Sequence, residues 1–150
     1  MNTLEKLEWA TIVGATVLLF GLGTLAVPVL QALDDPDYYG EPDYVVKVIA
    51  EQWAWKFIYP DGSESGELII KNGDLVRLEL ESPDVIHSFY VREMGFKVDI
   101  IPGKTRIHII NAETPGEYWI QCAEFCGAYH GGMRTCLLYT SPSPRDQRGS

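Results

Sequence analysis

The chain has 150 residues, of which 46% are hydrophobic and 22% charged, a composition typical of one folded domain with an appendage. Its formal net charge at pH 7 is -9, which excludes a general nucleic-acid-binding protein because phosphate recognition requires clustered Lys and Arg. An acidic surface instead favours a basic partner.

The first predicted element is a transmembrane helix over residues 9–33. No charged residue lies between Glu8 and Asp34, in the segment WATIVGATVLLFGLGTLAVPVLQAL. A helix of this length spans the ~30 Å hydrocarbon core of a bilayer. A buried helix of a soluble protein normally carries a polar stripe, and a cleaved signal peptide has an apolar region of only about 7–15 residues. We therefore expect a retained, single-pass anchor in the cell membrane.

The charges that flank this segment predict its orientation. Residues 1–8 contain Lys6 and the terminal amine, whereas residues 34–43 (DDPDYYGEPD) contain neither Lys nor Arg. The positive-inside rule therefore predicts a short cytoplasmic end and an extracytoplasmic, periplasmic location for the rest of the chain. Residues 34–43 are acidic and contain two Pro, so we expect a linker that leaves the membrane.

From residue 44 onward the sequence has the pattern of short β-strands. Runs rich in Val, Ile, Tyr and Trp cover residues 44–59, 67–70, 74–82, 85–91, 96–101, 104–110 and 116–122. Turn signals such as NGD, SPD, IPGK and TPGE separate them. The pattern predicts a mainly β domain over residues 44–134, a small sandwich or Greek-key barrel. Residues 135–150 are polar and rich in Pro and Ser, which predicts a disordered or non-native tail.

Soft metal ligands are concentrated in one Gly-rich stretch, residues 122–133 (CAEFCGAYHGGM), which contains Cys122, Cys126, His130 and Met133. Thiolate and thioether sulfur favour Cu(I), Zn or iron–sulfur centres over Mg or Ca. The glycines allow the loop to curl around one centre. His87 follows a Pro-containing turn at the start of an apolar strand, and we expect it to supply a second imidazole. His108 lies in the middle of a strand, where a structural or surface role is expected.

Three interpretations of these donors remain open. In a binuclear copper site, both Cys bridge two ions, each His binds one of them, and Met133 and a main-chain carbonyl or Glu124 are weak ligands. A Cys2His2 zinc site matches the strong donors but leaves Met133 unused. A Cys122–Cys126 disulfide is plausible in an oxidising compartment. The number of donors favours binuclear copper.

The chain resembles subunit II of the haem–copper cytochrome c oxidases, from the anchor through Met133. The resemblance is carried by SPDVIHSFYVREMGFKVDIIPGK (82–104), GEYWIQCAEFCGAYHGGM (116–133) and the aromatic segment EQWAWKFIYP (51–60). It implies a cupredoxin-type Greek-key barrel that carries the dicopper centre CuA. It also implies a ligand set in which Cys122 and Cys126 bridge, His87 and His130 are terminal ligands, and Met133 and the Glu124 carbonyl are weak ligands.

The resemblance assigns three further roles. The Glu124 carboxylate would reach a Mg²⁺ at the interface with catalytic subunit I, and Trp53 would be the surface aromatic through which cytochrome c delivers its electron. Asp99 would lie at the subunit interface. Core packing is the alternative for Trp53 and its neighbour Trp55, and an ordinary surface position is the alternative for Asp99. The family continues past the Met with a closing strand that residues 134–146 do not resemble, so we expect an unpaired sheet edge.

The resemblance implies a function in electron relay. The chain would be the electron-entry subunit of a haem–copper terminal oxidase of the single-span bacterial or archaeal type. It would accept electrons from cytochrome c, pass them to haem in subunit I, and not itself reduce oxygen. The alternatives are the electron-entry subunit of a nitric or nitrous oxide reductase and a membrane-anchored copper-delivery protein.

Overall fold

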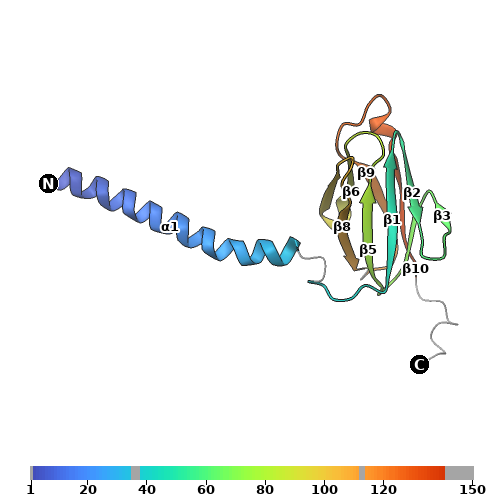
Figure 1. Cartoon of the computed structure of the whole chain (residues 1–150), viewed down its shortest axis with the longest axis horizontal. Helices are drawn as coiled ribbons and strands as arrows, with labels where there is room; N and C mark the ends of the chain where they lie inside the picture. Colours follow the sequence, from blue (N-terminus) through green and yellow to red (C-terminus); the bar gives the residue numbers. More distant parts are fainter. Residues whose placement is uncertain (1, 35–37, 112–113, 141–150) are drawn as a thin grey trace. The chain divides into compact units, whose positions relative to one another are not determined.

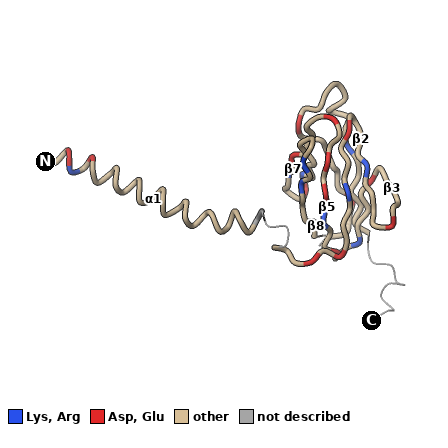
Figure 2. Tube along the Cα trace, in the orientation of Figure 1, with Lys and Arg blue, Asp and Glu red and all other residues tan. Residues whose placement is uncertain are grey.

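The computed structural model describes residues 2–34, 38–111 and 114–140, and the chain divides into two units after Tyr38. The first unit is one helix, α1 (Thr3–Asp34), in which Thr3–Ala32 is long and apolar enough to cross a membrane. Figure 2 shows charged residues at the start of α1 and none along its middle. The helix begins six residues before the predicted span because Asn2 and Glu5 cap it reciprocally. The Asn2 N–H donates to Glu5 Oε2 at 2.9 Å, and the Glu5 N–H donates to Asn2 Oδ1 at 2.8 Å.

The second unit is a β-sandwich of two five-stranded sheets (Figure 1). One sheet has the strand order β3-β2-β1-β5-β8 and the other β4-β10-β9-β6-β7. The strands are β1 (Tyr44–Glu51), β2 (Ala54–Ile58), β3 (Glu64–Ser65), β4 (Leu68–Lys71), β5 (Leu75–Glu81), β6 (His87–Val91), β7 (Phe96–Ile100), β8 (Arg106–Asn111), β9 (Gly116–Cys122) and β10 (Arg134–Thr140).

Alternating side chains of the strands form the core between the sheets. On β1, Val46, Val48 and Ala50 are fully buried while the residues between them are less buried, as the two-residue period of a strand requires. β5 repeats the pattern and lies parallel to β1, with Val46 opposite Leu78. The facing sheet contributes Phe89, Ile120 and Leu137, all fully buried. This alternation separates the core-facing side chains of each strand from the outward-facing ones.

Two parallel strand pairs define the topology, β1 with β5 and β10 with β4. Parallel neighbours cannot be joined by a hairpin. The chain therefore crosses to the other sheet after β3 and returns to the first sheet to form β5. This is the mainly β, Greek-key arrangement that the sequence predicted, preceded by one apolar helix.

The end of the domain differs from the prediction. β10 pairs antiparallel with β9 and parallel with β4, so it lies inside its sheet and fills the position of the closing strand that was expected to be missing. Leu137 is fully buried and Tyr139 is 5% exposed. The predicted boundary at residue 134 is therefore wrong, and the domain extends to Thr140. The alternation of Leu137 and Tyr139 on one face was hidden by the Ser/Pro-rich residues that follow. Residues 141–150 of the predicted tail lie outside the described residues.

Candidate metal centre

The loop of residues 123–133, which joins β9 to β10, forms one end of the sandwich (Figure 1). Two backbone hydrogen bonds close it, from the Cys122 N–H to the Met133 carbonyl at 2.9 Å and from the Ala123 N–H to the Ser88 carbonyl at 3.0 Å. The second bond ties the loop to β6, whose first residue is His87. A short 3-10 helix, His130–Gly132, turns the chain back toward β10. The predicted ligands therefore meet at one place, although the first and last of them, His87 and Met133, are 46 residues apart in the sequence.

The donor atoms of these residues lie at similar distances from one another. The two thiol sulfurs, of Cys122 and Cys126, are 3.7 Å apart. His87 Nδ1 is 3.8 Å from Cys122 Sγ, and His130 Nδ1 is 3.5 Å from Cys126 Sγ. Met133 Sδ is 3.7 Å from Cys126 Sγ, and the Glu124 carbonyl oxygen is 3.3 Å from Cys122 Sγ.

These spacings are those of atoms that bind a common metal. With metal–sulfur bonds of about 2.3 Å and metal–nitrogen bonds of about 2.0–2.1 Å, a tetrahedral ion places its ligands about 3.8 Å (S to S) and about 3.5 Å (S to N) apart. His87, Cys122 and Cys126 have ligand atoms within 4.8 Å of one another. Among the described residues, His130 does not belong to that set, although its Nδ1 is close to Cys126. The two imidazoles therefore approach different sulfurs.

The cluster is buried in the protein. His87 is fully buried, and Cys122, Cys126 and Met133 are 7%, 3% and 1% exposed. Burial raises the pKa of the Cys126 thiol well above its usual range, and the neighbouring Cys122 raises it further. A bound cation reverses this effect because coordination deprotonates a thiol. A hollow of about 260 Å³, lined by residues that include Cys122, His130 and Met133, reaches the cluster from solvent.

The carboxylate of Asp84 orients His87 from behind. His87 Nε2 lies 2.8 Å from Asp84 Oδ1. A proton on Nε2, donated to this carboxylate, leaves Nδ1 free to bind a metal on the cluster side. Asp84 also accepts hydrogen bonds from the backbone N–H groups of Gln52 and Val85, at 2.7 and 2.6 Å, and from the Ser82 hydroxyl at 3.1 Å. Burial raises the pKa of Asp84, but these hydrogen bonds outweigh burial and lower it to about 2.

The turn between β1 and β2 packs against the loop. Gln52 Nε2 donates a 2.7 Å hydrogen bond to the Cys126 carbonyl. Gly127 has a φ of 119°, and a Cβ at this position would lie 3.0 Å from Gln52 Nε2 and 3.2 Å from Trp53 Nε1. Glycine therefore allows both the backbone conformation and the close approach. Trp53 is half-buried and contacts the Tyr129 ring edge to face, with centroids 4.9 Å apart. The predicted electron-entry residue thus touches the ligand loop, whereas Trp55 is a core residue, 5% exposed.

Asp99 and Glu124 meet around one lysine. Lys97 Nζ is 2.6 Å from Asp99 Oδ1 and 3.4 Å from Glu124 Oε2. The hydrogen bond from Lys97, followed by one from Ser88, lowers the pKa of Asp99. The two carboxylates predicted to face another subunit are therefore neighbours on the surface.

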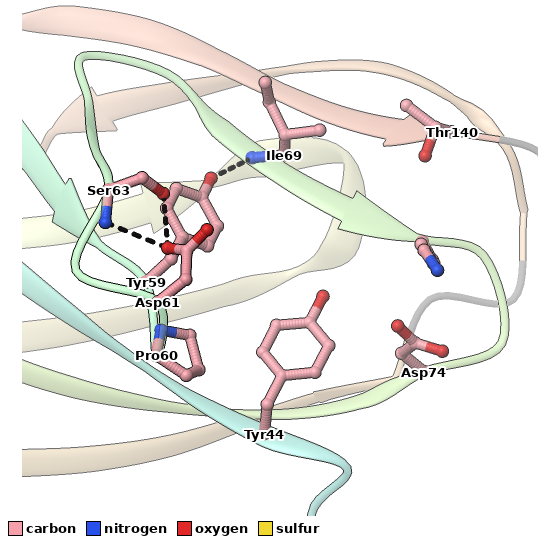
Figure 3. A pocket seen from close by; sticks show the side chains of 9 residues that line it. Tyr44, Tyr59, Pro60, Asp61, Ser63, Ile69, Asp74 and Thr140 are labelled. Carbon is pink, nitrogen blue, oxygen red and sulfur yellow. Dashed lines mark hydrogen bonds between the residues drawn. The ribbon is translucent and has the colours of Figure 1, made fainter.

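The remaining candidates lie away from the cluster. His108 is half-buried on β8 and packs against Phe96 with ring centroids 4.3 Å apart and the ring planes tilted by 36°, as expected of a structural histidine. A larger hollow, of about 630 Å³, lies at the end of the sandwich where β1 begins and β10 ends. Figure 3 shows Tyr44, Tyr59 and Asp74 on its walls. Among the described residues that line it there is no Cys, His or Met.

The sequence did not reveal the contacts that Asp84, Gln52, Lys97 and Tyr129 make around the cluster. Asp84 belongs to the motif SPD, which indicated only a turn, and its position three residues before a candidate ligand was the available signal. Contacts of Gln52 and Lys97 with the loop connect residues far apart in sequence, which spacing alone does not reveal.

Two packed β-sheets with a Cys/His/Met cluster at one end define a cupredoxin-like domain, which follows an apolar helix in the chain. Residues 63–138 match the family model described as cytochrome c oxidase subunit II, periplasmic domain. The chain belongs to this family of oxidoreductase subunits.

Individual relatives agree with this assignment. The chain is 42% identical over 113 residues to cytochrome c oxidase subunit 2 of Synechocystis sp. and 48% identical over 109 residues to that of Thermostichus vulcanus. These matches cover 75% and 71% of the chain but only 34% and 33% of the relatives, so the chain spans about a third of their length. The crystal structure of the periplasmic domain of subunit II (CoxB) of Bradyrhizobium japonicum aligns with a TM-score of 0.65 and 25% identity, over 72% of this chain and 91% of that one.

Proposed function

We propose that this chain is the electron-entry subunit of a haem–copper terminal oxidase, anchored by α1 with the β domain on the extracytoplasmic side. It accepts electrons from cytochrome c at a binuclear CuA centre and passes them to haem in subunit I. Family membership supports the oxidase role, and the Cys/His/Met cluster supports a copper site. The observation that carries the proposal is the pair of sulfurs 3.7 Å apart with one imidazole beside each.

This arrangement fits two ions better than one. A single tetrahedral Cys2His2 ion would hold all four donors within about 3.8 Å of one another, but His130 is outside the compact set formed by His87 and the two Cys. Two ions that share both sulfurs need one imidazole each. Met133 Sδ and the Glu124 carbonyl supply the weak donors, beside Cys126 and Cys122 respectively. Thiolate and thioether ligands select copper over hard cations.

The residues around the cluster hold it in one geometry. A dicopper centre shares a transferred electron between two ions, which reduces the change in each bond length. The chain contributes rigidity, because Asp84 fixes the His87 ring and Gln52 fixes the Cys126 carbonyl. Such outer hydrogen bonds also adjust the basicity of the ligands. Little rearrangement is then needed when the electron arrives or leaves.

We propose that Trp53 receives the electron and that Glu124 and Asp99 face subunit I. Trp53 suits this role because it contacts the ligand loop at Gly127 and Tyr129. The carboxylates of Glu124 and Asp99 are oxygen ligands of the kind Mg²⁺ prefers. In the chain alone both carboxylates lie beside Lys97.

Electron uptake by the copper-loaded chain tests the proposal. The full chain in detergent, loaded with copper and oxidised, is mixed rapidly with ferrous cytochrome c, and haem oxidation is followed at its absorption band. One electron should be taken up per chain, and none by the copper-free chain or by a Cys126→Ser variant. A copper-delivery protein would instead bind copper without oxidising the cytochrome, and that result would refute the relay function.

A further inference from the structure

Tyr129 is an exposed aromatic residue in the ligand loop to which no role has been assigned above. It is 69% exposed, whereas Trp53 beside it is half-buried. The rings meet edge to face at an interplanar angle of 74°, with centroids 4.9 Å apart. A protein that approaches Trp53 at this contact therefore meets Tyr129 as well.

The backbone holds Tyr129 in this position. The Tyr129 carbonyl accepts a 2.9 Å hydrogen bond from Gly132, and the next residue, His130, donates a 3.1 Å hydrogen bond to the Gly127 carbonyl. Tyr129 is thus the N-cap residue of the short helical turn that also presents the His130 imidazole to Cys126. A fixed Tyr loses little conformational entropy when a partner covers it, which is why Tyr is enriched at the centres of protein interfaces.

We propose that Tyr129 is the outer docking residue for the electron donor, a basic one-electron donor protein, and that it works together with Trp53. This rests on the proposed function and extends it. Tyr129 supplies apolar contact area with a polar hydroxyl at the rim, and Trp53 forms the inner contact with the loop. The net charge of -9 complements a basic donor.

Electron transfer from the donor needs no chemical change in the rings of Tyr129 and Trp53. One electron leaves the ferrous haem of the donor, which becomes ferric, and the electron reduces the proposed dicopper centre. No proton moves and no bond forms or breaks at Tyr129 or Trp53. Their contact matters because electron tunnelling weakens steeply across gaps between groups that are not in contact.

The test compares Tyr129→Ser and Tyr129→Phe with Phe125→Ser in the full chain. Phe125 is a matched control because it is 77% exposed in the same loop and its ring packs near His130. Binding of zinc-substituted cytochrome c, which carries no ferrous haem, is measured on the copper-free chain, so the result does not depend on copper loading. Electron uptake from ferrous cytochrome c is measured on the loaded chain.

Tyr129→Ser should raise the dissociation constant and lower the second-order rate constant of electron uptake by about tenfold, the effect of removing one interface anchor. Tyr129→Phe should change both by less than about twofold because the ring is kept. If Tyr129→Ser binds like the native chain, or if Phe125→Ser weakens binding equally, the role of Tyr129 is refuted. In either case a native chain that still takes up one electron leaves the proposed function intact.

Discussion

Replacing Asp84 with Asn tests whether one carboxylate holds the cluster together. Asp84 Oδ1 accepts from His87, Val85 and Ser82, and Oδ2 accepts from the Gln52 N–H at 2.7 Å. Asparagine has a single acceptor oxygen, so its NH₂ group would face the Gln52 N–H, donor against donor. The loss is one charge-assisted hydrogen bond, worth roughly 1.5–3 kcal/mol when protected from water.

The Asp84 side chain is 28% exposed, so water replaces part of what is lost. We expect Asp84→Asn to lower the free energy of unfolding of the copper-free chain by about 1–2 kcal/mol. It should also lower copper affinity about tenfold, because the neutral amide orients the His87 imidazole less strongly. Urea unfolding and competition for copper with a chelator of known affinity measure the two effects.

Asp61→Asn is the matched control. Asp61 Oδ1 accepts from the backbone N–H and the hydroxyl of Ser63, within its own turn and away from the cluster. The Asp61→Asn substitution should leave copper affinity unchanged. If Asp84→Asn binds copper as tightly as the native chain, or if Asp61→Asn weakens binding as much, the argument that Asp84 positions His87 fails.

Three further predictions concern the loop, a histidine and the net charge. Gly127→Ala should lower the free energy of unfolding, measured in urea, by about 1–3 kcal/mol, because φ is positive and the added Cβ meets Trp53 and Gln52. The control Gly131→Ala, with open space around it, should change this free energy by less than about 0.5 kcal/mol. Equal effects of the two substitutions would refute the claim that residue 127 needs glycine. Burial lowers the pKa of His108, so this histidine binds more protons in the unfolded state than in the folded state. As pH falls from about 7 to about 5, the native chain should therefore lose more stability than the His108→Gln variant. Identical pH profiles would contradict this. Raising the ionic strength from about 0.01 to about 0.15 M shortens the Debye length from about 30 to about 8 Å, which should slow association with cytochrome c. An association rate that is independent of salt would exclude electrostatic steering.

The sequence was most informative where chemistry is local. Four of the predicted ligands are close in sequence, namely Cys122, Cys126, His130 and Met133. Such a combination of side chains has few functions other than metal binding. The strand pattern likewise predicted the mainly β fold. The start of α1 was misjudged by six residues because its cap, Asn2 and Glu5, lies outside the apolar pattern.

The features that were missed depend on contacts between distant parts of the chain. Asp84 acts through the backbone of Gln52, 32 residues earlier, and Gln52 reaches the carbonyl of Cys126, 74 residues later. No spacing rule connects these positions. β10 was missed because the Ser/Pro-rich residues after it hid its alternation, and its place between β9 and β4 is decided by sheet pairing.

Counting copper and recording its electron paramagnetic resonance spectrum test the central claim most directly. If two sulfurs are shared by two ions, the oxidised chain should hold about two coppers and show a signal from one unpaired electron spread over both nuclei, and Cys122→Ser or Cys126→Ser should abolish that signal. One zinc per chain, a signal confined to one copper, or an unchanged spectrum in either Ser variant would contradict the account.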